Sequence, residues 1–260
     1  MKQGFIVPVY RHGNTVGPLA EKLICFGLPV IIVDDGNDAE TKALLAELAA
    51  RIPALVLVRL EKNSGKGGAV TAGLKEASRL GLTHVLQIDA DGQHDTGRIS
   101  FFLEESLRQP DKVISGYPEF DETAPRGRVR GRKISNFWAA IVTLSGELCD
   151  VLCGFRVYPV EAAMQIAVNP FVDKRMGFDP EILVRLYWKG VHTVFHPIKV
   201  FYPQGGISSF HIVKDNVRIS LMFTRLFIGM LIRLPRLAFS RLRARSRVRN
   251  CAGKNMRGAS

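Results

Sequence analysis

The chain has 260 residues, of which 47% are hydrophobic and 23% are charged, and its formal net charge is +12 at pH 7. This is the composition of an ordinary globular protein, long enough for one large α/β domain with or without an appendage. The charge is uneven, because residues 211–260 contain 12 Lys and Arg against the single acid Asp215, whereas the preceding part is almost neutral. No stretch reaches 18 apolar residues, so no helix is expected to cross a bilayer.

The N-terminus and the cysteines point to the same compartment. The segment before Pro8 is too short for the apolar region of a signal peptide and is typical of a first strand. The four cysteines have neither the spacing of a zinc site nor that of a redox motif. We therefore expect reduced thiols in an intracellular protein; these residues are Cys25, Cys149, Cys153 and Cys251.

Residues 3 to about 115 alternate between short apolar runs and amphipathic runs, which is the pattern of parallel strands joined by helices. Apolar residues have helical spacing in Thr41–Ala50 and Gly68–Leu80. The predicted strands are Phe5–Val9, Val30–Val33, Leu55–Arg59, Val85–Ile88 and Val113–Ser115.

The second half of the chain is less regular. Tyr117–Arg132 is rich in Pro, Gly and charged residues and is predicted to be a mobile loop. The elements expected after it are a helix over about 134–146, a strand at Phe155–Tyr158, a helix at Pro180–Lys189 and a strand at Thr193–Tyr202. The first half of the chain therefore resembles a nucleotide-binding unit. The second half resembles an added segment that faces the acceptor.

Two acids follow the fourth predicted strand directly. Asp89 and Asp91 stand one residue apart, so they would reach toward the same opening at the carboxyl end of the sheet. Mg²⁺ or Mn²⁺ typically takes one or two carboxylates from protein and the remaining ligands from phosphates and water. A calcium loop is excluded, because His94 and Ser100 stand where that loop needs Gly and Glu. The first hypothesis is a metal-bridged nucleotide substrate; the alternative is a solvated acidic turn.

Other strand ends carry groups suited to a nucleotide. A base could stack on Tyr10, and an Asp at the end of the second strand, Asp34 or Asp35, could accept an N–H of that base. Asp38 and the two acids before it have the alternative role of capping a helix that begins near Ala39. Asn63–Ala69 matches neither a P-loop nor a dinucleotide fingerprint, but a Gly-rich turn with Lys66 at a helix start suits a diphosphate. A plain turn is the alternative.

These motifs, in this order, resemble the GT-A glycosyltransferases of family 2, in the branch that includes dolichyl-phosphate mannosyltransferase and bacterial polyprenyl-phosphate sugar transferases. The resemblance continues through Asp150–Tyr158 and Gly177–Leu183 and covers roughly residues 3–211. It implies an α/β fold, an α/β/α sandwich with a mostly parallel central sheet, as a domain over residues 1–211. An amphipathic helix and a basic tail would follow over residues 212–260.

The resemblance also implies roles for particular residues. The nucleobase would be held by Pro8, Tyr10 and Asp35, and Lys66 would lie near the nucleotide. Asp89 and Asp91 would bind the divalent metal, and Gln93 could join them.

On the acceptor side, the resemblance places Arg132 and Ser135 where lipid-phosphate transferases hold phosphate. Asp150 is the candidate for orienting or deprotonating an acceptor, with an ion pair to Arg156 as the alternative. Asp179 and Glu181 are expected to cap the helix that starts at Pro180.

The C-terminal segment Ile212–Phe239 has apolar residues on a helical period, interrupted by arginines. Such a helix suits a membrane interface, and the arginines that follow it would add attraction to an anionic leaflet. The alternative is a helix packed on the catalytic body with a basic end. No nucleic acid is expected as a partner, because the tail lacks interleaved aromatic residues.

The sequence thus predicts an enzyme that transfers a sugar from a nucleoside-diphosphate sugar with Mg²⁺ or Mn²⁺, with inversion as the family implies. The acceptor would be membrane-associated, a lipid phosphate or a hydroxyl, at the cytoplasmic face where the protein is peripherally bound. One alternative is a sugar-1-phosphate nucleotidyltransferase, although Val7–Gly17 lacks that class's long Gly-rich phosphate loop. Another is a non-catalytic membrane-binding protein that retains the fold. The sequence leaves the oligomeric state open.

Overall fold

The computed structural model describes residues 1–119, 126–200 and 212–255, and within these it leaves out the side chains of Arg126, Arg128, 212–214, Arg236 and 238–255. A seven-stranded sheet has the order β3-β2-β1-β4-β6-β5-β7, and every pairing is parallel except those of β6. The strands are β1 (Gln3–Val9), β2 (Val30–Asp34), β3 (Leu55–Arg59), β4 (His84–Gln87), β5 (Val113–Glu119), β6 (Arg156–Pro159) and β7 (Thr193–Lys199).

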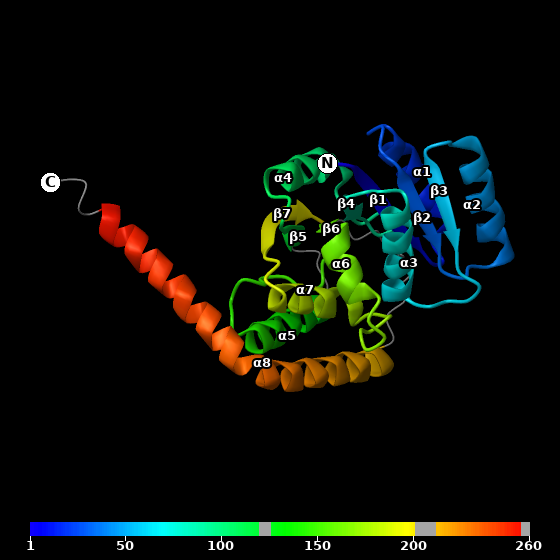
Figure 1. Ribbon diagram of the computed structural model, residues 1–260. Coiled ribbons are helices and arrows are strands. Elements are labelled where there is room, and N and C mark those ends of the chain that lie inside the picture. The colour runs from blue at the N-terminus through cyan, green and yellow to red at the C-terminus, as the bar shows by residue number, and fades with distance from the viewer. Residues whose placement is uncertain (120–125, 201–211, 256–260) are drawn as a thin grey trace.

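Helices cover both faces of this sheet (Figure 1). One face packs against α1 (Gly13–Ile24), α2 (Ala39–Arg51) and α4 (Ile99–Arg108). The other packs against α3 (Lys66–Arg79), α6 (Val160–Ala167) and α7 (Phe178–Trp188). Beyond this second layer lie α5 (Arg126–Thr143) and α8 (Ile212–Asn255), which pack against each other and against α7. The short 3₁₀ helix η1 (Thr96–Arg98) precedes α4.

The two faces of the sheet follow from the alternation of side chains along a strand. In β1, Phe5 and Val7 belong to the core under α1, α2 and α4, whereas Ile6 belongs to the core on the other face. The parallel register pairs Phe5 with Val30 and Ile6 with Ile31, so β2 repeats the same alternation. A strand that is buried on both faces has an almost continuous apolar sequence. The short apolar runs of the sequence therefore predicted these strands correctly. The predicted α/β/α sandwich with a mostly parallel sheet is confirmed.

The prediction of a loop over Tyr117–Arg132 is wrong at both ends. Strand β5 continues to Glu119 and pairs with β7, and α5 begins at Arg126; residues 120–125 lie outside the described part. Pro118 is tolerated because the described β5–β6 pairs end at Ser115, so β5 has a ladder on one side only at that point. Gly127 and Gly131 lower the helix propensity of α5, and its packing against α7 and α8 overrides that weakness.

The last predicted strand also changes at its end. Strand β7 ends at Lys199, and Val200 forms an isolated bridge with His94. The predicted continuation to Tyr202 lies outside the described residues. Among the described residues, no helix combines the length and the apolar character needed to cross a membrane.

Candidate active site

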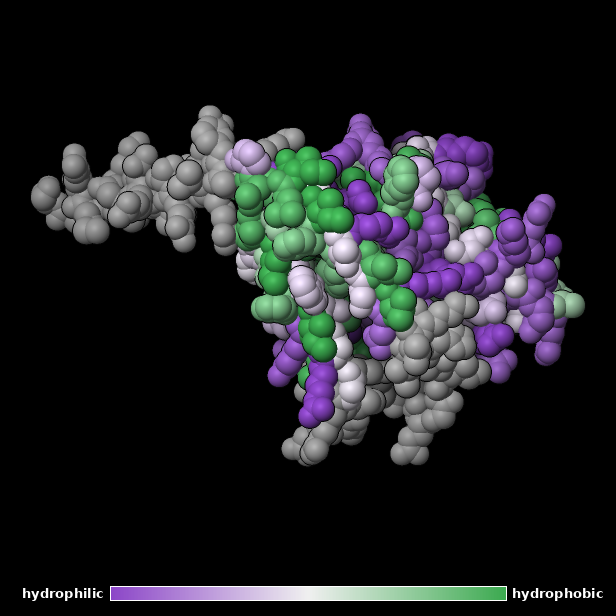
Figure 2. All heavy atoms as spheres, turned by 90° about the horizontal axis from the view of Figure 1, so that it is seen from below, coloured by the Kyte–Doolittle hydropathy of each residue, from purple (hydrophilic) through white to green (hydrophobic). Residues whose placement is uncertain are grey.

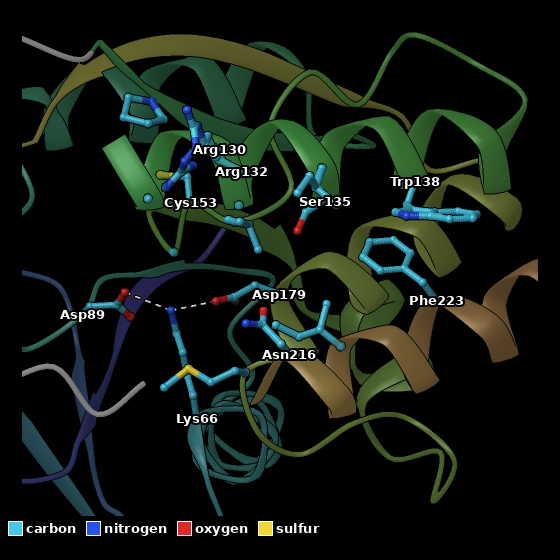
Figure 3. A pocket seen from close by; sticks show the side chains of 18 of the residues that line it. Lys66, Asp89, Arg130, Arg132, Ser135, Trp138, Cys153, Asp179, Asn216 and Phe223 are labelled. Atoms are coloured by element: carbon cyan, nitrogen blue, oxygen red, sulfur yellow. Dashed lines mark hydrogen bonds and ion pairs between the residues drawn. The ribbon is translucent and has the colours of Figure 1, made fainter. Parts of the chain in front are cut away.

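The carboxyl ends of the parallel strands face a cavity of about 1250 Å³ that runs toward α5 and α8 (Figure 3). At its polar end lie Lys66, Asp89, Asp91, Gln93 and Asp179, and α5 contributes Arg132 and Ser135 further along. The cavity therefore brings together six of the residues singled out from the sequence for the nucleotide, the metal and the acceptor phosphate. Pro8, Tyr10, Asp35 and Asp150 are not among the described residues that line it.

The centre of the polar end is Lys66, at the first position of α3. Its Nζ lies 2.8 Å from Asp89 Oδ2 and 2.7 Å from Asp179 Oδ2. Burial by itself would lower the pKa of the Lys66 ammonium, but the two carboxylates, Asp179 first, outweigh burial and raise that pKa above its usual value. Burial would likewise raise the pKa of Asp89, but Lys66 and His94 hold it below the usual range. Lys66 and Asp89 therefore remain charged at neutral pH.

A divalent cation fits the acidic side of this end. Asp89 Oδ1 is buried and has no hydrogen-bond partner among the described residues, so one oxygen of that carboxylate is available to a ligand. Asp91 accepts the backbone N–H of Gln93 at 3.0 Å, which fixes the turn that presents both side chains to the cavity. The described residues hold no cluster of three or more His, Cys, Asp or Glu that would form an all-protein metal site. Two carboxylates and an amide match Mg²⁺ or Mn²⁺ bound together with substrate phosphates.

A glycine makes room for the ion pair. A Cβ added at Gly154 would lie 2.5 Å from both Asp89 Oδ2 and Lys66 Nζ. No residue with a side chain can occupy that place unless the pair moves.

Asp35 lies beside the Gly-rich turn that starts α3. Its Oδ1 accepts the backbone N–H of Ser64 at 2.6 Å, and its Oδ2 accepts that of Gly65 at 2.9 Å. Gly65 has φ +84°, and a Cβ there would meet the backbone of Lys174, so the turn needs glycine. Burial raises the pKa of Asp35, although the two backbone hydrogen bonds act in the opposite direction. The carboxylate thus fixes the turn that presents Lys66.

The first strand-end loop is held by polar contacts. Arg11 follows Tyr10 with φ +61°, its guanidinium lies 5.1 Å from the centre of the Tyr10 ring, and its N–H donates to Asn37 Oδ1 at 2.7 Å. Asp38 caps α2 by accepting the N–H of Thr41 at 2.9 Å, as the capping alternative predicted.

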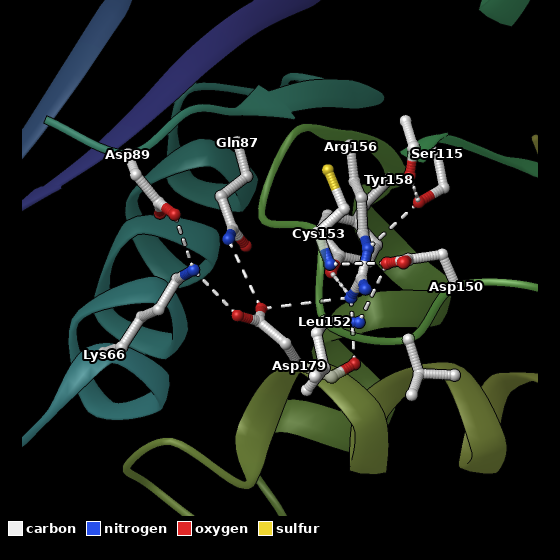
Figure 4. A network of polar contacts seen from close by, with 12 residues as sticks. Lys66, Gln87, Asp89, Ser115, Asp150, Leu152, Cys153, Arg156, Tyr158 and Asp179 are labelled. Atoms are coloured by element: carbon white, nitrogen blue, oxygen red, sulfur yellow. Dashed lines mark hydrogen bonds and ion pairs between the residues drawn. The ribbon is translucent and has the colours of Figure 1, made fainter. Parts of the chain in front are cut away.

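The acceptor side contains an ion pair that the sequence did not predict. Arg132 Nη1 donates to Asp150 Oδ2, and Asp150 Oδ1 accepts the N–H groups of Leu152 and Cys153 at 3.1 and 2.8 Å. The predicted alternative, a pair between Asp150 and Arg156, is wrong. Arg156 is fully buried and instead contacts Asp179 (Figure 4).

Asp179 is the site residue that the sequence did not identify. It was expected to cap the helix starting at Pro180, but its carboxylate turns to Lys66 and Gln87, and Gly177 is the N-cap of α7. Glu181 was expected to cap as well, but it accepts the N–H of Asp173 and pairs with Arg185. Both acids lie in the first turn of α7, and only the packing of α7 on α3 shows where they point.

The far end of the cavity is apolar. Ile134 and Trp138 of α5 face Ile219, Phe223 and Phe227 of α8 across it, and the Trp138 and Phe223 rings lie 6.5 Å apart. A ligand that fills the whole cavity would therefore have a charged end at Lys66 and an apolar end between α5 and α8.

Comparison of the sequence with known protein families agrees with the fold and the motifs. Residues 5–166, more than half of the chain, match the sequence model of the family described as Glycosyl transferase family 2. The chain belongs to glycosyl transferase family 2. This membership does not favour either alternative that the sequence left open, a nucleotidyltransferase or a non-catalytic protein.

Named relatives of this family 2 protein act on lipid phosphates. A dolichyl-phosphate beta-glucosyltransferase of Trichomonas vaginalis is 29% identical over 202 residues, covering 69% of this chain and 58% of that protein. An undecaprenyl-phosphate mannosyltransferase of Micrococcus luteus is 25% identical and covers 74% of this chain and 81% of that protein. The chain thus spans less than two thirds of the Trichomonas relative.

Solved structures show the same fold. Glucosyl-3-phosphoglycerate synthase of Mycobacterium tuberculosis, solved with Mn²⁺ and uridine-diphosphate-glucose, superposes with a TM-score of 0.61 at 15% identity. The superposition covers 88% of this family 2 chain and 78% of the synthase.

Proposed function

We propose that this chain transfers a sugar from a nucleoside-diphosphate sugar to a polyprenyl-phosphate acceptor at a membrane surface, with a divalent cation and with inversion. One observation carries the proposal: a single cavity joins the Lys66–Asp89–Asp91 end to an apolar end between α5 and α8. The names of the relatives support a lipid-phosphate acceptor.

On the donor side, Lys66 would attract the diphosphate, and Asp89, Asp91 and Gln93 would hold the cation. A bound cation neutralises the charge that grows on the departing diphosphate. Pro8 and Tyr10 lie at the carboxyl end of β1, and Asp35 follows the neighbouring strand β2 and lies beside the turn that presents Lys66. We assign them to the nucleobase side of the donor, with Asp35 acting through the turn.

On the acceptor side, Arg132 and Ser135 would hold the phosphate. A phosphate is already anionic at neutral pH, so it needs no strong base to attack the sugar, whereas a hydroxyl does. Both oxygens of Asp150 are engaged, one by Arg132 and the other by two backbone N–H groups. We therefore assign Asp150 to orienting Arg132. The phosphate oxygen forms the new bond to the sugar carbon as the bond to the diphosphate breaks on the opposite face.

Membrane attachment would come from α8, with α5 beside it. Apolar side chains gather on the underside of the molecule, where α8 runs (Figure 2). Among the described residues of the two helices, the exposed large apolar ones are Ile134, Phe137, Trp138, Val217, Leu221, Phe227, Ile228, Leu231, Ile232 and Leu234. This face is apolar, and arginines follow it in the sequence. An anionic bilayer would bury the apolar side chains and attract the arginines.

The test compares Asp91→Asn with Asp95→Asn in sugar transfer to polyprenyl phosphate in vesicles, using UDP-glucose and GDP-mannose as donors with Mn²⁺. Asp95 lies in the same loop, where it accepts the N–H of Gly97 rather than lining the cavity, so it is a matched control. We expect Asp91→Asn to lose transfer and the Mn²⁺-dependent part of UDP affinity, and Asp95→Asn to keep both. Equal transfer by the two variants would contradict the metal assignment.

A further inference from the structure

Lys66 is one cation placed between two carboxylates that come from different parts of the fold. Asp89 follows β4, and Asp179 lies in the first turn of α7. Figure 4 shows the ammonium between them, with contacts of 2.8 and 2.7 Å. The Asp179 side chain is only 9% exposed, so its polar contacts come from neighbouring groups rather than from water.

Asp179 is itself held from the protein side. Arg156 donates from Nη1 to the Asp179 backbone carbonyl at 2.8 Å and lies 3.9 Å from its Oδ1. Gln87 Nε2 donates to the same Oδ1 at 3.4 Å. Arg156 is fully buried and also contacts Ser115 and Tyr158, so its position is fixed. The arrangement leaves Asp179 Oδ2 facing Lys66.

Under the proposed function, Asp89 interacts with two cations. Its Oδ2 pairs with Lys66, and its Oδ1 is available to bind the divalent cation. Two cations on one carboxylate repel each other, so a lysine whose sole partner was Asp89 would compete with the metal. The second carboxylate removes this competition, because Lys66 has another anion within contact distance.

We propose that Asp179 is a positioning residue that keeps Lys66 in the donor site when a divalent cation takes Asp89. Lys66 and the cation then occupy the site together, the first balanced by Asp179 and the second by Asp89 and Asp91. Arg156 and Gln87 hold Asp179 in place for this purpose. The inference rests on the proposed function, because it requires a cation at Asp89.

The test measures binding of Mn²⁺ alone, from the free Mn²⁺ signal in electron paramagnetic resonance, so it does not depend on turnover. The proteins compared are the wild type, Asp179→Asn, Lys66→Met and the double variant, with Asp111→Asn as an exposed control of equal charge change. We expect Asp179→Asn to weaken Mn²⁺ binding about tenfold, because Lys66 then competes for Asp89. Adding Lys66→Met should restore binding to at least the wild-type level.

The pattern of rescue separates this role from a structural one. If Asp179 only supported α7, Lys66→Met would not restore Mn²⁺ binding, and that result would overturn the inference. Equal binding by wild type and Asp179→Asn would overturn it as well, while leaving the metal assignment intact. Absence of Mn²⁺ binding by the wild type would instead contradict the proposed function. Should Asp179→Asn fail to fold, Lys66→Met alone decides: the inference requires that it binds Mn²⁺ no more weakly than the wild type.

Discussion

At the scale of single residues, the site depends on close contact as much as on charge. Gly154 packs its backbone against the Lys66–Asp89 pair, in a space that a methyl group would fill. Gly146 offers a comparison in the same segment between α5 and β6, because a Cβ there would meet nothing within 4 Å. A substitution by alanine would therefore disturb the site at Gly154 but not at Gly146.

We expect the methyl group of Gly154→Ala to displace both Lys66 and Asp89. This should weaken UDP binding in the presence of Mn²⁺ by about tenfold or more, a difference of about 1.4 kcal/mol. Overpacking at this point should also lower the free energy of unfolding, by about 1–3 kcal/mol. Calorimetric titration and chemical denaturation measure the two effects. Gly146→Ala should leave UDP affinity unchanged; a similar loss in both variants would show that displacement of Lys66 and Asp89 is not the cause.

The depressed pKa of Asp89 has a consequence for acid stability. A carboxyl whose pKa is lower in the folded than in the unfolded state stabilises the fold above the unfolded value, near 4, and this contribution is lost as pH falls through the folded value. The wild type should therefore lose stability as the pH drops below about 4, and Asp89→Asn should show a shallower loss over that range. Thermal unfolding across an acidic pH series measures the slopes, and parallel slopes would count against the pairing.

At the scale of elements, α8 is apolar on two sides. Met222, Leu226 and Met230 are buried against the body, and Arg225 lies 3.5 Å from Glu181 of α7. Leu221, Ile228 and Ile232 point outward and are exposed. The sequence showed one apolar stripe and left open whether it meets the body or a membrane. Periodicity alone could not separate the inner from the outer residues, because the answer depends on where α5 and α7 lie.

Two substitutions that lie two residues apart, on opposite sides of the helix, should separate these faces. Leu226→Ala opens a space in the core and should lower the free energy of unfolding by about 2–5 kcal/mol. Ile228→Ser, on the exposed face, should leave stability within about 0.5 kcal/mol of the wild type but reduce binding to anionic vesicles. Denaturation and vesicle sedimentation give the two readouts. Vesicle binding that Ile228→Ser does not change would remove the outer face from the membrane proposal.

The sequence predicted elements best where burial dominates. The runs around Ile6 and Ile31 are apolar because both faces of the sheet are covered, and they formed strands as expected. The sequence puts Arg132 in a predicted loop, because Gly127 and Gly131 weaken the signal of a helix that tertiary packing stabilises. Among site residues, Lys66, Asp89 and Asp91 follow strand ends and could be identified. Asp179 could not, because its role depends on a contact with α3, far away in the sequence.

At the scale of the whole molecule, the cavity sets the relation between catalysis and the membrane. Its charged end lies at the carboxyl edge of the sheet, and its apolar end lies between α5 and α8, the helices with the exposed apolar residues. The C-terminal part of α8 bends and extends away from the body (Figure 1), and the helix contains Pro235, the residue type that most often kinks helices. The basic part of the tail is thus separate from the residues proposed for catalysis.

A truncation after Ala238 tests this division, because it removes the arginines from Arg241 onward and keeps Leu237, which is buried in the core. The full chain should sediment with anionic vesicles at low salt and be partly released at high salt, since screening weakens the arginines but not the apolar face. The truncated protein should bind anionic vesicles more weakly, with little salt dependence, and should retain UDP and Mn²⁺ binding. If both proteins bound anionic and neutral vesicles equally, the tail would have no part in attachment. If the truncated protein lost UDP binding, the tail would belong to the catalytic body.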